Sequence, residues 1–328
     1  MKVSHIIGTD LSKASIDLFC HGLKSYLKIN NCLTGFKQIL SWLKDQKIKT
    51  SAVMIVMEHT GLYSYHLEAF LHEHQIRFTK VSALAIKRSL GLIRGKNDKI
   101  DAQRIARYAH EKSDQLIAAT KPDPRLERLQ MLHSTRERLV KQRASLICAV
   151  KEYQAVLKQS DVIITAQLEL IKNFTRQIKV IDAAIGELMT KEQNISQSYQ
   201  LLKSVKGVGK VLATATIIKT KNFTLFANAR KFACFCGTAP FENSSGKSIR
   251  HKTRVSHLAD KGMKTLLDLS AKSAIQYDKE LKAYYQRRIE MGKSKKSTIN
   301  IVRNKILYRM FAVIRRQTPF VENYLQTA

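Results

Sequence analysis

The sequence is poor in acidic residues, in proline and in long apolar runs, and each shortage excludes a class of protein. Only 26 Asp and Glu residues stand against 57 Lys and Arg residues, which gives the 328-residue chain a formal net charge of +31. No run of about 18 uncharged apolar residues occurs, so we expect no membrane span. Glycine (13) and proline (4) are scarce and 44% of the residues are hydrophobic, which excludes a disordered basic tail.

Cysteine is also sparse. The chain has five cysteines, an odd number in a long sequence, which fits a reducing compartment rather than a disulfide framework. The first residues lead into a strand-like run without the apolar segment and cleavage site of a signal peptide. We therefore expect a cytoplasmic protein.

What the sequence has in excess is positive charge, and it is unevenly placed. Residues 201–328 hold 26 Lys and Arg against 7 Asp and Glu, whereas residues 1–100 hold 15 against 7. A basic excess of this size is typical of proteins that neutralise the phosphates of nucleic acids. The last third of the chain is thus the main candidate for a nucleic-acid surface.

The pattern of residues 1–120 predicts an α/β domain. Residues 52–57 form a continuous apolar run, which is typical of a central strand covered on both faces. Similar but shorter patterns predict the other elements. We expect strands at 3–9, 14–20, 25–29, 52–57 and 77–81, and helices at 33–46, 61–74 and from about 83 to 118.

Residues 121–200 predict a pair of long helices after a linker that is marked by Pro122 and Pro124. Leu132, Leu139 and Leu146 are seven residues apart, and Ile164, Ile171, Ile178 and Ile185 repeat at the same spacing. The pattern breaks around residues 159–161. Such a stripe is either the core of a helical hairpin or a dimer seam, and we favour a coiled-coil hairpin that also mediates self-association into a dimer or tetramer.

Residues 201–328 predict a mainly α-helical domain. A glycine-rich turn at residues 204–210 precedes an expected helix at 211–219. Further helices are expected at 227–236, 259–276, 278–290 and 296–316.

Four acidic residues suggest a metal site in the α/β domain. Asp10 follows the first strand and Glu58 follows the apolar strand, while Asp98 and Asp101 share one face of a helix. If the first and fourth strands are neighbours, their ends bring Asp10 and Glu58 together. A single Asp after a strand is usually a turn residue, but several crowded carboxylates repel unless a cation lies between them. Oxygen ligands favour Mg²⁺ or Mn²⁺, and a pair of such ions is a common means of breaking phosphodiesters.

These acids and their surroundings carry a resemblance to a known family. The segments Gly8-Thr9-Asp10-Leu11-Ser12, Glu58-His59-Thr60-Gly61 and Asn97-Asp98-Lys99-Ile100-Asp101 resemble the motifs of RuvC-like (RNase H-type) nucleases. More narrowly, the chain resembles the DEDD transposases of the insertion-sequence 110 family, which are related to the Piv DNA invertase. The resemblance covers nearly the whole chain and implies a RuvC-like domain at 1–120, a coiled-coil hairpin at 121–200 and a C-terminal transposase domain at 201–328.

A second motif supports the resemblance. Gly237 and Pro240 have the spacing of the family's Gly-x-x-Pro, and Ser245-Gly246 follows five residues later. The resemblance implies that Ser245 is the catalytic serine, although Ser244 stays an adjacent candidate. It also implies a composite mechanism, in which metal ions held by Asp10, Glu58, Asp98 and Asp101 activate a phosphate that the serine attacks.

Two basic segments are candidates for nucleic-acid binding. One resembles a helix-hairpin-helix turn, whose backbone N–H groups suit a phosphate, and consists of Lys206, Gly207, Gly209 and Lys210. The other flanks the serine and either clamps the reacting phosphate or makes ordinary backbone contacts to DNA or RNA. It consists of Lys247, Arg250, His251, Lys252 and Arg254.

The resemblance further implies the partners and the place of action. They are target and donor DNA, a noncoding bridge RNA and further copies of the chain, near the nucleoid of a bacterium or archaeon. Two alternatives remain open from the residues. A nuclease that resolves Holliday junctions with metal-activated water needs the four acids without Ser245, and a catalytically dead nucleic-acid-binding protein needs none of them.

Overall fold

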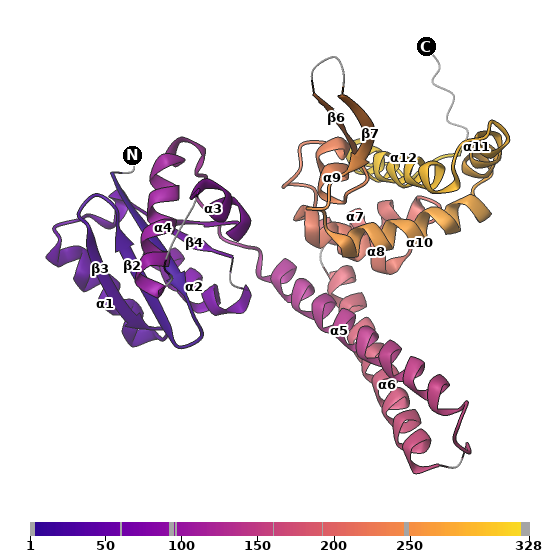
Figure 1. The fold of residues 1–328 in the computed structure, drawn as a ribbon, viewed down its shortest axis with the longest axis horizontal. Coiled ribbons are helices and arrows are strands. Elements are labelled where there is room, and N and C mark those ends of the chain that lie inside the picture. Colours follow the sequence, from indigo (N-terminus) through magenta and orange to yellow (C-terminus); the bar gives the residue numbers. More distant parts are fainter. Residues whose placement is uncertain are drawn as a thin grey trace. The chain divides into compact units, whose positions relative to one another are not determined.

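A computed structural model describes residues 4–59, 61–91, 95, 97–159, 161–191, 193–245 and 249–322, with the backbone alone at 243, 245 and 249–252. The chain divides into two compact units, Met1–Pro122 and Asp123–Ala328, each with its own hydrophobic core (Figure 1). Within the described ranges no helix has the length and apolar character needed to cross a membrane.

The first unit is built on a mixed five-stranded sheet with the order β3-β2-β1-β4-β5. Strands β1, β2 and β3 form an antiparallel meander, and β4 and β5 run parallel to β1. The strands are β1 (His5–Leu11), β2 (Ser15–Cys20), β3 (Ser25–Asn30), β4 (Val53–Glu58) and β5 (Arg77–Val81). The prediction of an α/β fold for this part of the chain is confirmed.

Helices cover both faces of the sheet, as the apolar β4 requires. Helices α1 (Leu33–Asp45) and α2 (Tyr65–Glu73) bury Phe36, Leu43 and Phe70 against one face. On the other face, α3 (Ala83–Ser89) and α4 (Asp98–Glu111) pack through small and branched side chains, among them Ile86, Ile105 and Ala109. Short 3-10 turns lie at Thr50–Ala52 (η1), Gly61–Ser64 (η2) and Ser113–Gln115 (η3).

The predicted helix from about 83 to 118 is wrong in one respect, since the structure has two helices there. Gly91 and Gly95 adopt positive φ angles of 63° and 72°, a conformation that a continuing helix excludes. Asn97 then starts α4 as its N-cap, because its side-chain Oδ1 accepts a hydrogen bond from the Ile100 amide at 2.8 Å. As a result, Asp98 and Asp101 lie in the first turn of α4 rather than in mid-helix.

The second unit begins with two long antiparallel helices, α5 (Pro124–Tyr153) and α6 (Val162–Lys191) (Figure 1). Asp123 caps α5, and Pro124 takes the first helical position, where a missing N–H costs nothing. Polar contacts join the pair near its base, where Arg136 Nε donates to Asp182 Oδ1 at 2.5 Å. Leu132, Ile164, Ile178 and Ile185 of the heptad stripe are buried within the chain, and α5 packs along α6, so much of the stripe is an intramolecular interface.

The rest of the second unit is mainly helical, and this prediction is confirmed. The helices are α7 (Gln193–Ser204), α8 (Lys210–Thr220), α9 (Ala229–Phe235), α10 (Lys261–Tyr277), α11 (Lys279–Glu290) and α12 (Lys295–Arg316). Their core surrounds Phe232, Leu267 and Ile306, and it continues to Leu132 and Ile185 at the base of α5 and α6.

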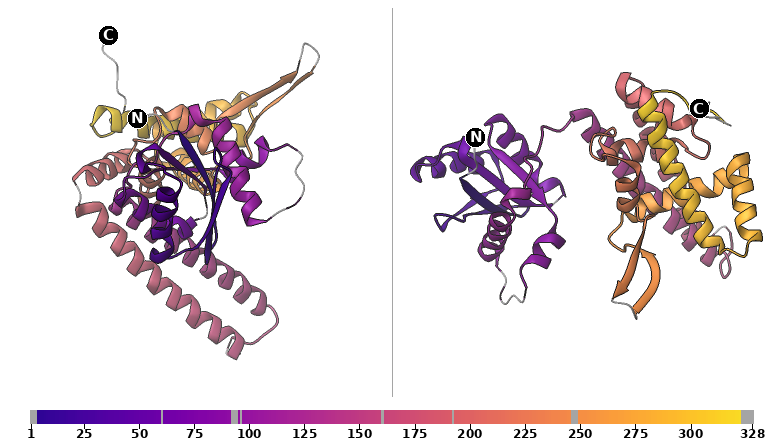
Figure 2. Two further views of the ribbon diagram at one scale, coloured as in Figure 1. Left: turned by 90° about the vertical axis from the view of Figure 1, so that its left-hand side faces the viewer. Right: turned by 90° about the horizontal axis from the view of Figure 1, so that it is seen from above.

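One element was not predicted. Strands β6 (Pro240–Ser245) and β7 (Ile249–Val255) form a hairpin that stands out from the helices (Figures 1 and 2). The sequence gives little signal for it because polar and charged residues fill both strands, without the apolar alternation of a half-buried strand.

Candidate active site

The sheet brings Asp10 and Glu58 to neighbouring strand ends, as the expected strand order predicts. Strands β1 and β4 are parallel, with Thr9 opposite Met57. Asp10 and Glu58 come next on their strands, so the carboxyl ends of two adjacent strands present both acids at the same edge.

Gly8 allows α4 to lie directly on β1. A Cβ atom at Gly8 would lie 2.2 Å from the Ala106 backbone nitrogen and 2.3 Å from the Ala102 carbonyl oxygen. Any side chain at this position would therefore push the helix away from the sheet. This close contact holds the first turn of α4, with Asp98 and Asp101, near the end of β1.

The electrostatics of Asp10 reflect its burial and the charges of the other three predicted acids. Burial is the main cause and the charges of Asp101, Asp98 and Glu58 follow in that order, and together they raise the pKa of the Asp10 carboxyl to about 6. Such a shift is expected for a partly desolvated carboxyl group with other carboxylates nearby.

A fifth acid, Asp17, was not predicted from the sequence. Asp17 lies opposite Asp10 in the pairing of β1 with β2 and is only 2% exposed. Its charge also raises the pKa of Asp10. The Tyr26 hydroxyl donates a hydrogen bond to Asp17, and burial together with this bond raises the pKa of Tyr26 to about 12. The signal was an acid in the middle of the apolar strand Ser15–Cys20, where charge is costly without a partner.

Two basic side chains lie among the acids. The Lys28 ammonium lies 3.8 Å from Asp17 Oδ2 and 3.7 Å from Asp98 Oδ2. Arg104 donates to Asp101 Oδ1 at 2.9 Å and to the Gly95 carbonyl at 2.8 Å. These contacts partly neutralise the carboxylates.

The donor set suits a hard divalent cation. Among the residues that the structure describes, no three Asp, Glu, His or Cys side chains converge closely enough to hold one ion. The acids around Asp10 nevertheless offer only carboxylate oxygens, and their mutual repulsion is what a bound cation would relieve. On this chemistry the residues fit Mg²⁺ or Mn²⁺, with Asp10, Glu58, Asp98 and Asp101 as the candidate ligands.

The serine motif lies on the β6–β7 hairpin. The backbone of Ser245 pairs with Ile249 and that of Ser244 with Arg250. The exposed Ser244 hydroxyl lies 3.3 Å from Glu242 Oε1. The side chain of Ser245 lies outside the described residues.

The basic residues that flank the serine are described only in part. Arg254 is exposed and lies opposite Phe241 in the hairpin. Lys247 lies outside the described residues, as do the side chains of Arg250, His251 and Lys252.

The glycine turn before α8 has a packing role. Gly207 has a φ of 88°, and a Cβ there would lie 2.7 Å from the Ser270 carbonyl oxygen of α10. The Ser270 hydroxyl in turn donates to the Gly207 carbonyl at 2.6 Å. Lys206 forms an ion pair with Glu322, whereas Gly209 takes the N-cap position of α8 without a side-chain cap. The geometry of Gly207 thus follows from close contact between α7, α8 and α10.

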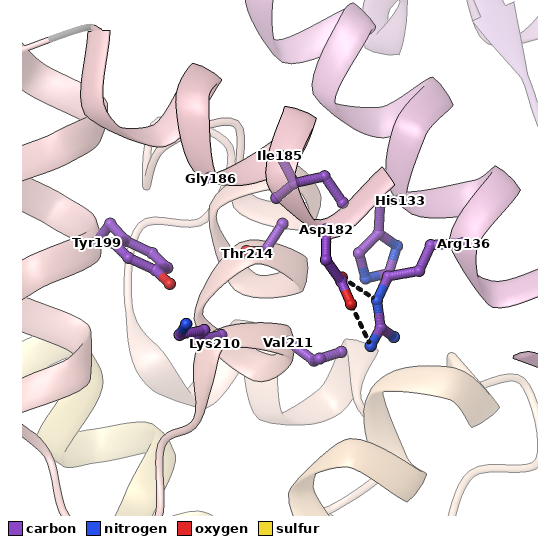
Figure 3. A pocket seen from close by; sticks show the side chains of 9 residues that line it. All are labelled: His133, Arg136, Asp182, Ile185, Gly186, Tyr199, Lys210, Val211 and Thr214. Atoms are coloured by element: carbon purple, nitrogen blue, oxygen red, sulfur yellow. Dashed lines mark hydrogen bonds and ion pairs between the residues drawn. The ribbon is translucent and has the colours of Figure 1, made fainter. Parts of the chain in front are cut away.

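A cavity of about 220 Å³ lies where α5 and α6 meet α7 and α8 (Figure 3). Arg136 and Asp182 are ion-paired on one side, and Tyr199 and Lys210 lie on the other. Burial lowers the pKa of His133, which also lines the cavity. The remaining lining residues are Ile185, Gly186, Val211 and Thr214.

Sequence comparisons place the chain among known proteins. A family model described as "Transposase" matches residues 7–160, and a second, described as "Transposase IS116/IS110/IS902 family", matches residues 199–286. A pilin gene-inverting protein of Moraxella bovis is 26% identical, over 96% of this chain and 97% of its own length. A putative transposase of Sinorhizobium fredii is 24% identical, over 70% of this chain and 63% of its own length.

The α/β unit with its edge of acids, the basic helical unit and these relatives define a DNA recombinase of the transposase and invertase class. The chain belongs to the IS110 family of transposases. Transposases of this DEDD type generally use divalent metal ions.

Proposed function

We propose that this transposase cuts and exchanges DNA strands with two sets of residues, the carboxylates of a RuvC-like domain and a serine of the C-terminal domain. The observation that carries the proposal is that adjacent ends of β1 and β4 and the first turn of α4 bring Glu58, Asp98 and Asp101 close enough to Asp10 for their charges, together with burial, to raise its pKa. The strand order β3-β2-β1-β4-β5, with only β2 antiparallel to both its neighbours, supports the RuvC-like assignment.

Asp10, Glu58, Asp98 and Asp101 hold the divalent metal ions in this proposal. The ions, when bound, polarise the scissile phosphate and neutralise charge that develops on it. Asp10 must lose its proton before it can act as a ligand. Lys28 and Arg104 pair with the neighbouring acids and limit their repulsion until then.

Ser245 supplies the nucleophile. Its oxygen attacks the phosphorus and loses its proton, and the bond from phosphorus to one deoxyribose oxygen breaks, so that a DNA hydroxyl leaves. A phosphodiester between serine and DNA replaces the one that was cut. Because the number of phosphodiester bonds is unchanged, the reverse attack by a hydroxyl of another strand completes the exchange without external energy.

Three functional regions support this reaction. We assign residues 1–120 to metal binding, 121–200 to a coiled-coil hairpin and 201–328 to the serine and most of the nucleic-acid surface. Exposed apolar residues on α6 and on the segment between α5 and α6 support self-association through the hairpin, namely Val156, Val162, Leu170 and Val180. Target and donor DNA are the substrates, and the charge of residues 201–328 is large enough for an element-encoded bridge RNA as well. We place the reaction in the cytoplasm, at the nucleoid.

The metal-site proposal is tested by Asp10→Ala and Asp101→Ala. In an assay of strand cleavage on DNA that the wild-type chain cuts, both variants are expected to lose activity by about 10³-fold or more. Binding of the same DNA stays within about threefold, because the carboxylates repel phosphates rather than bind them directly. Asp45→Ala, at an exposed acid at the end of α1, is the matched control. Wild-type cleavage in either site variant would reject the assignment.

The RNA partner needs a separate test. The chain is purified from cells that carry its gene with the flanking DNA, and the bound RNA is sequenced. We expect enrichment of one transcript from the flanking DNA, and the loss of strand exchange when that transcript is deleted. If the chain binds RNA without selectivity and strand exchange continues after the transcript is deleted, RNA guidance is rejected.

A further inference from the structure

The β6–β7 hairpin depends on its base for its direction. The described side chains of both strands beyond the base are exposed, including those of Phe241, Glu242 and Arg254. Figures 1 and 2 show the hairpin standing away from the helices. Whatever fixes the residues before Pro240 and after Val255 therefore fixes where the serine motif points.

Thr238, two residues before β6, is held by the side chains of α12. Thr238 is fully buried, and its hydroxyl donates to Asn304 Oδ1 at 2.8 Å. Asn304 Nδ2 donates back to the Thr238 carbonyl at 2.9 Å, so one amide group contacts both the hydroxyl and the carbonyl of the threonine. Asn300 Nδ2 donates to the same carbonyl at 2.8 Å.

These bonds have little to do with the stability of α12 itself. Asn is a poor helix former, and Asn300 and Asn304 lie one turn apart on the same face of the helix. Their amides contact Thr238, which precedes them by more than 60 residues in the chain. Losing one partner would leave a buried polar group with fewer hydrogen bonds and so weaken the hold on Thr238.

The other end of the hairpin has its own fixed connection. The Asp260 amide donates to the Phe235 carbonyl at 2.9 Å, and the Asp260 carboxylate accepts from the Met263 amide at 2.9 Å. Lys219 of α8 pairs with the same carboxylate at 2.8 Å. The return strand is thus tied to α8, α9 and α10, and the entry strand to α12.

We propose that Thr238, Asn300 and Asn304 form a polar lock that positions the serine hairpin for the reaction. They are positioning residues that act through the hairpin. The functional part of the inference, that the lock speeds the reaction, rests on the proposed role of Ser245. The mechanical part, that the lock fixes the position of the hairpin, does not.

The mechanical part is tested with two spin labels, at Thr253→Cys on β7 and Glu290→Cys on α11, both exposed. The exposed native Cys32 and Cys148 are replaced by serine. Pulsed electron paramagnetic resonance then gives the distribution of distances between the two labels in the full chain. We expect Thr238→Val and Asn304→Leu to broaden the distribution roughly twofold, because a segment with fewer buried bonds samples more positions.

Three further variants keep this test decisive. Thr238→Ser retains the hydroxyl and should leave the distribution unchanged. Asn300→Ala removes one of the two side-chain hydrogen bonds to the Thr238 carbonyl, together with a 3.3 Å bond from Arg303, and covers the case in which Asn304→Leu fails to fold. Arg309→Met breaks the contacts of α12 with Asp278 and Glu280, which do not involve the hairpin, and is the matched control.

The functional part is tested by the rate of covalent protein–DNA adduct formation. In Thr238→Val and Asn304→Leu we expect the rate to fall by about tenfold or more, since small misplacements of a nucleophile are costly. Binding to a labelled random-sequence duplex should change by less than about twofold. Thr238→Ser should restore the wild-type rate.

An unchanged distance distribution together with wild-type adduct formation would overturn the lock. If the distribution broadens and the adduct rate does not fall, the hairpin position does not matter for the reaction and the functional part is rejected. If the wild-type chain forms no serine adduct, the proposed function fails, while the spin labels still decide the mechanical part.

Discussion

Asp17 of β2 lies opposite Asp10 of β1 in the antiparallel pairing of the two strands. This pairing makes Asp17 the fourth carboxylate that acts on Asp10, and the Tyr26 hydroxyl holds Asp17 in place. Asp17 is buried and Asp10 is partly buried, so the repulsion between them is less screened than on the open surface. Without a cation, carboxylates in the α/β unit therefore repel one another, and a bound cation would reduce this repulsion.

A first prediction concerns Asp10→Asn in the absence of divalent metal. The folded-state pKa of Asp10 is about 6, above its usual 3.8, so ionised Asp10 destabilises the folded unit. The penalty is absent below about pH 4 and develops as the pH rises through about 6. At pH 7 in EDTA we expect Asp10→Asn to raise the Tm by roughly 4 °C, a shift typical of ~1 kcal/mol in a domain of this size.

The control for this measurement is Asp114→Asn, an exposed acid of η3 in the same unit. It should change the Tm by less than about 1 °C. At pH 4 the advantage of Asp10→Asn should disappear, because the wild-type carboxyl is then protonated. A gain that is equal at both pH values would contradict the raised pKa.

A second prediction concerns metal binding. Mg²⁺ or Mn²⁺ should raise the Tm of the wild-type chain by mass action, and this gain should be larger at pH 8 than at pH 5.5. Asp10 must deprotonate to bind, so the apparent affinity falls up to about tenfold for each pH unit below 6. Thermal unfolding over a metal titration at both pH values measures the rise in Tm. The Asp101→Asn variant should show no such rise. An equal gain at both pH values would count against Asp10 as a ligand.

A third prediction concerns the contact between β1 and α4. Gly8→Ala places a methyl group within 2.3 Å of two backbone atoms of α4, so the helix must move. We expect a loss of about 3 kcal/mol in the free energy of unfolding and a loss of strand cleavage, because Asp98 and Asp101 move with the helix. Gly22→Ala is the control, as a Cβ there meets nothing within 4 Å. Chemical denaturation and cleavage assays check both variants. Equal free energies of unfolding and equal cleavage rates in Gly8→Ala and Gly22→Ala would contradict the packing argument.

A fourth prediction concerns the basic C-terminal region. DNA binding should weaken steeply with salt, by about 10³-fold between 50 and 200 mM if at least six phosphates are contacted. Arg254→Ala should lower the slope of log K against log salt by about one, whereas Lys191→Ala, at a residue paired with Glu187 on α6, should leave it unchanged. Fluorescence anisotropy with a labelled duplex measures the slopes. A flat salt response would contradict the electrostatic account.

Some of this site could be predicted from the sequence, because strand order and helical spacing are local consequences of residue pattern. The adjacency of Asp10 and Glu58 followed from the meander and the apolar run of β4, and the structure confirms that β1 and β4 are neighbours. Asp17 was missed because its importance depends on register, which alternation alone does not fix. The β6–β7 hairpin was missed because its strands lack apolar alternation, and the contacts of Asn300 and Asn304 at its base come from far along the chain, where no local pattern shows them.

The central claim is that a serine of the hairpin becomes covalently linked to DNA. The most direct measurement incubates the purified chain with its RNA, target DNA, donor DNA and Mg²⁺, and looks for a protein–DNA adduct on a denaturing gel. The account predicts an adduct in the wild type and in Ser244→Ala, and none in Ser245→Ala. Cleavage without any adduct, unaffected by either substitution, would mean that water is the nucleophile and that the chain acts as a nuclease of the junction-resolving type.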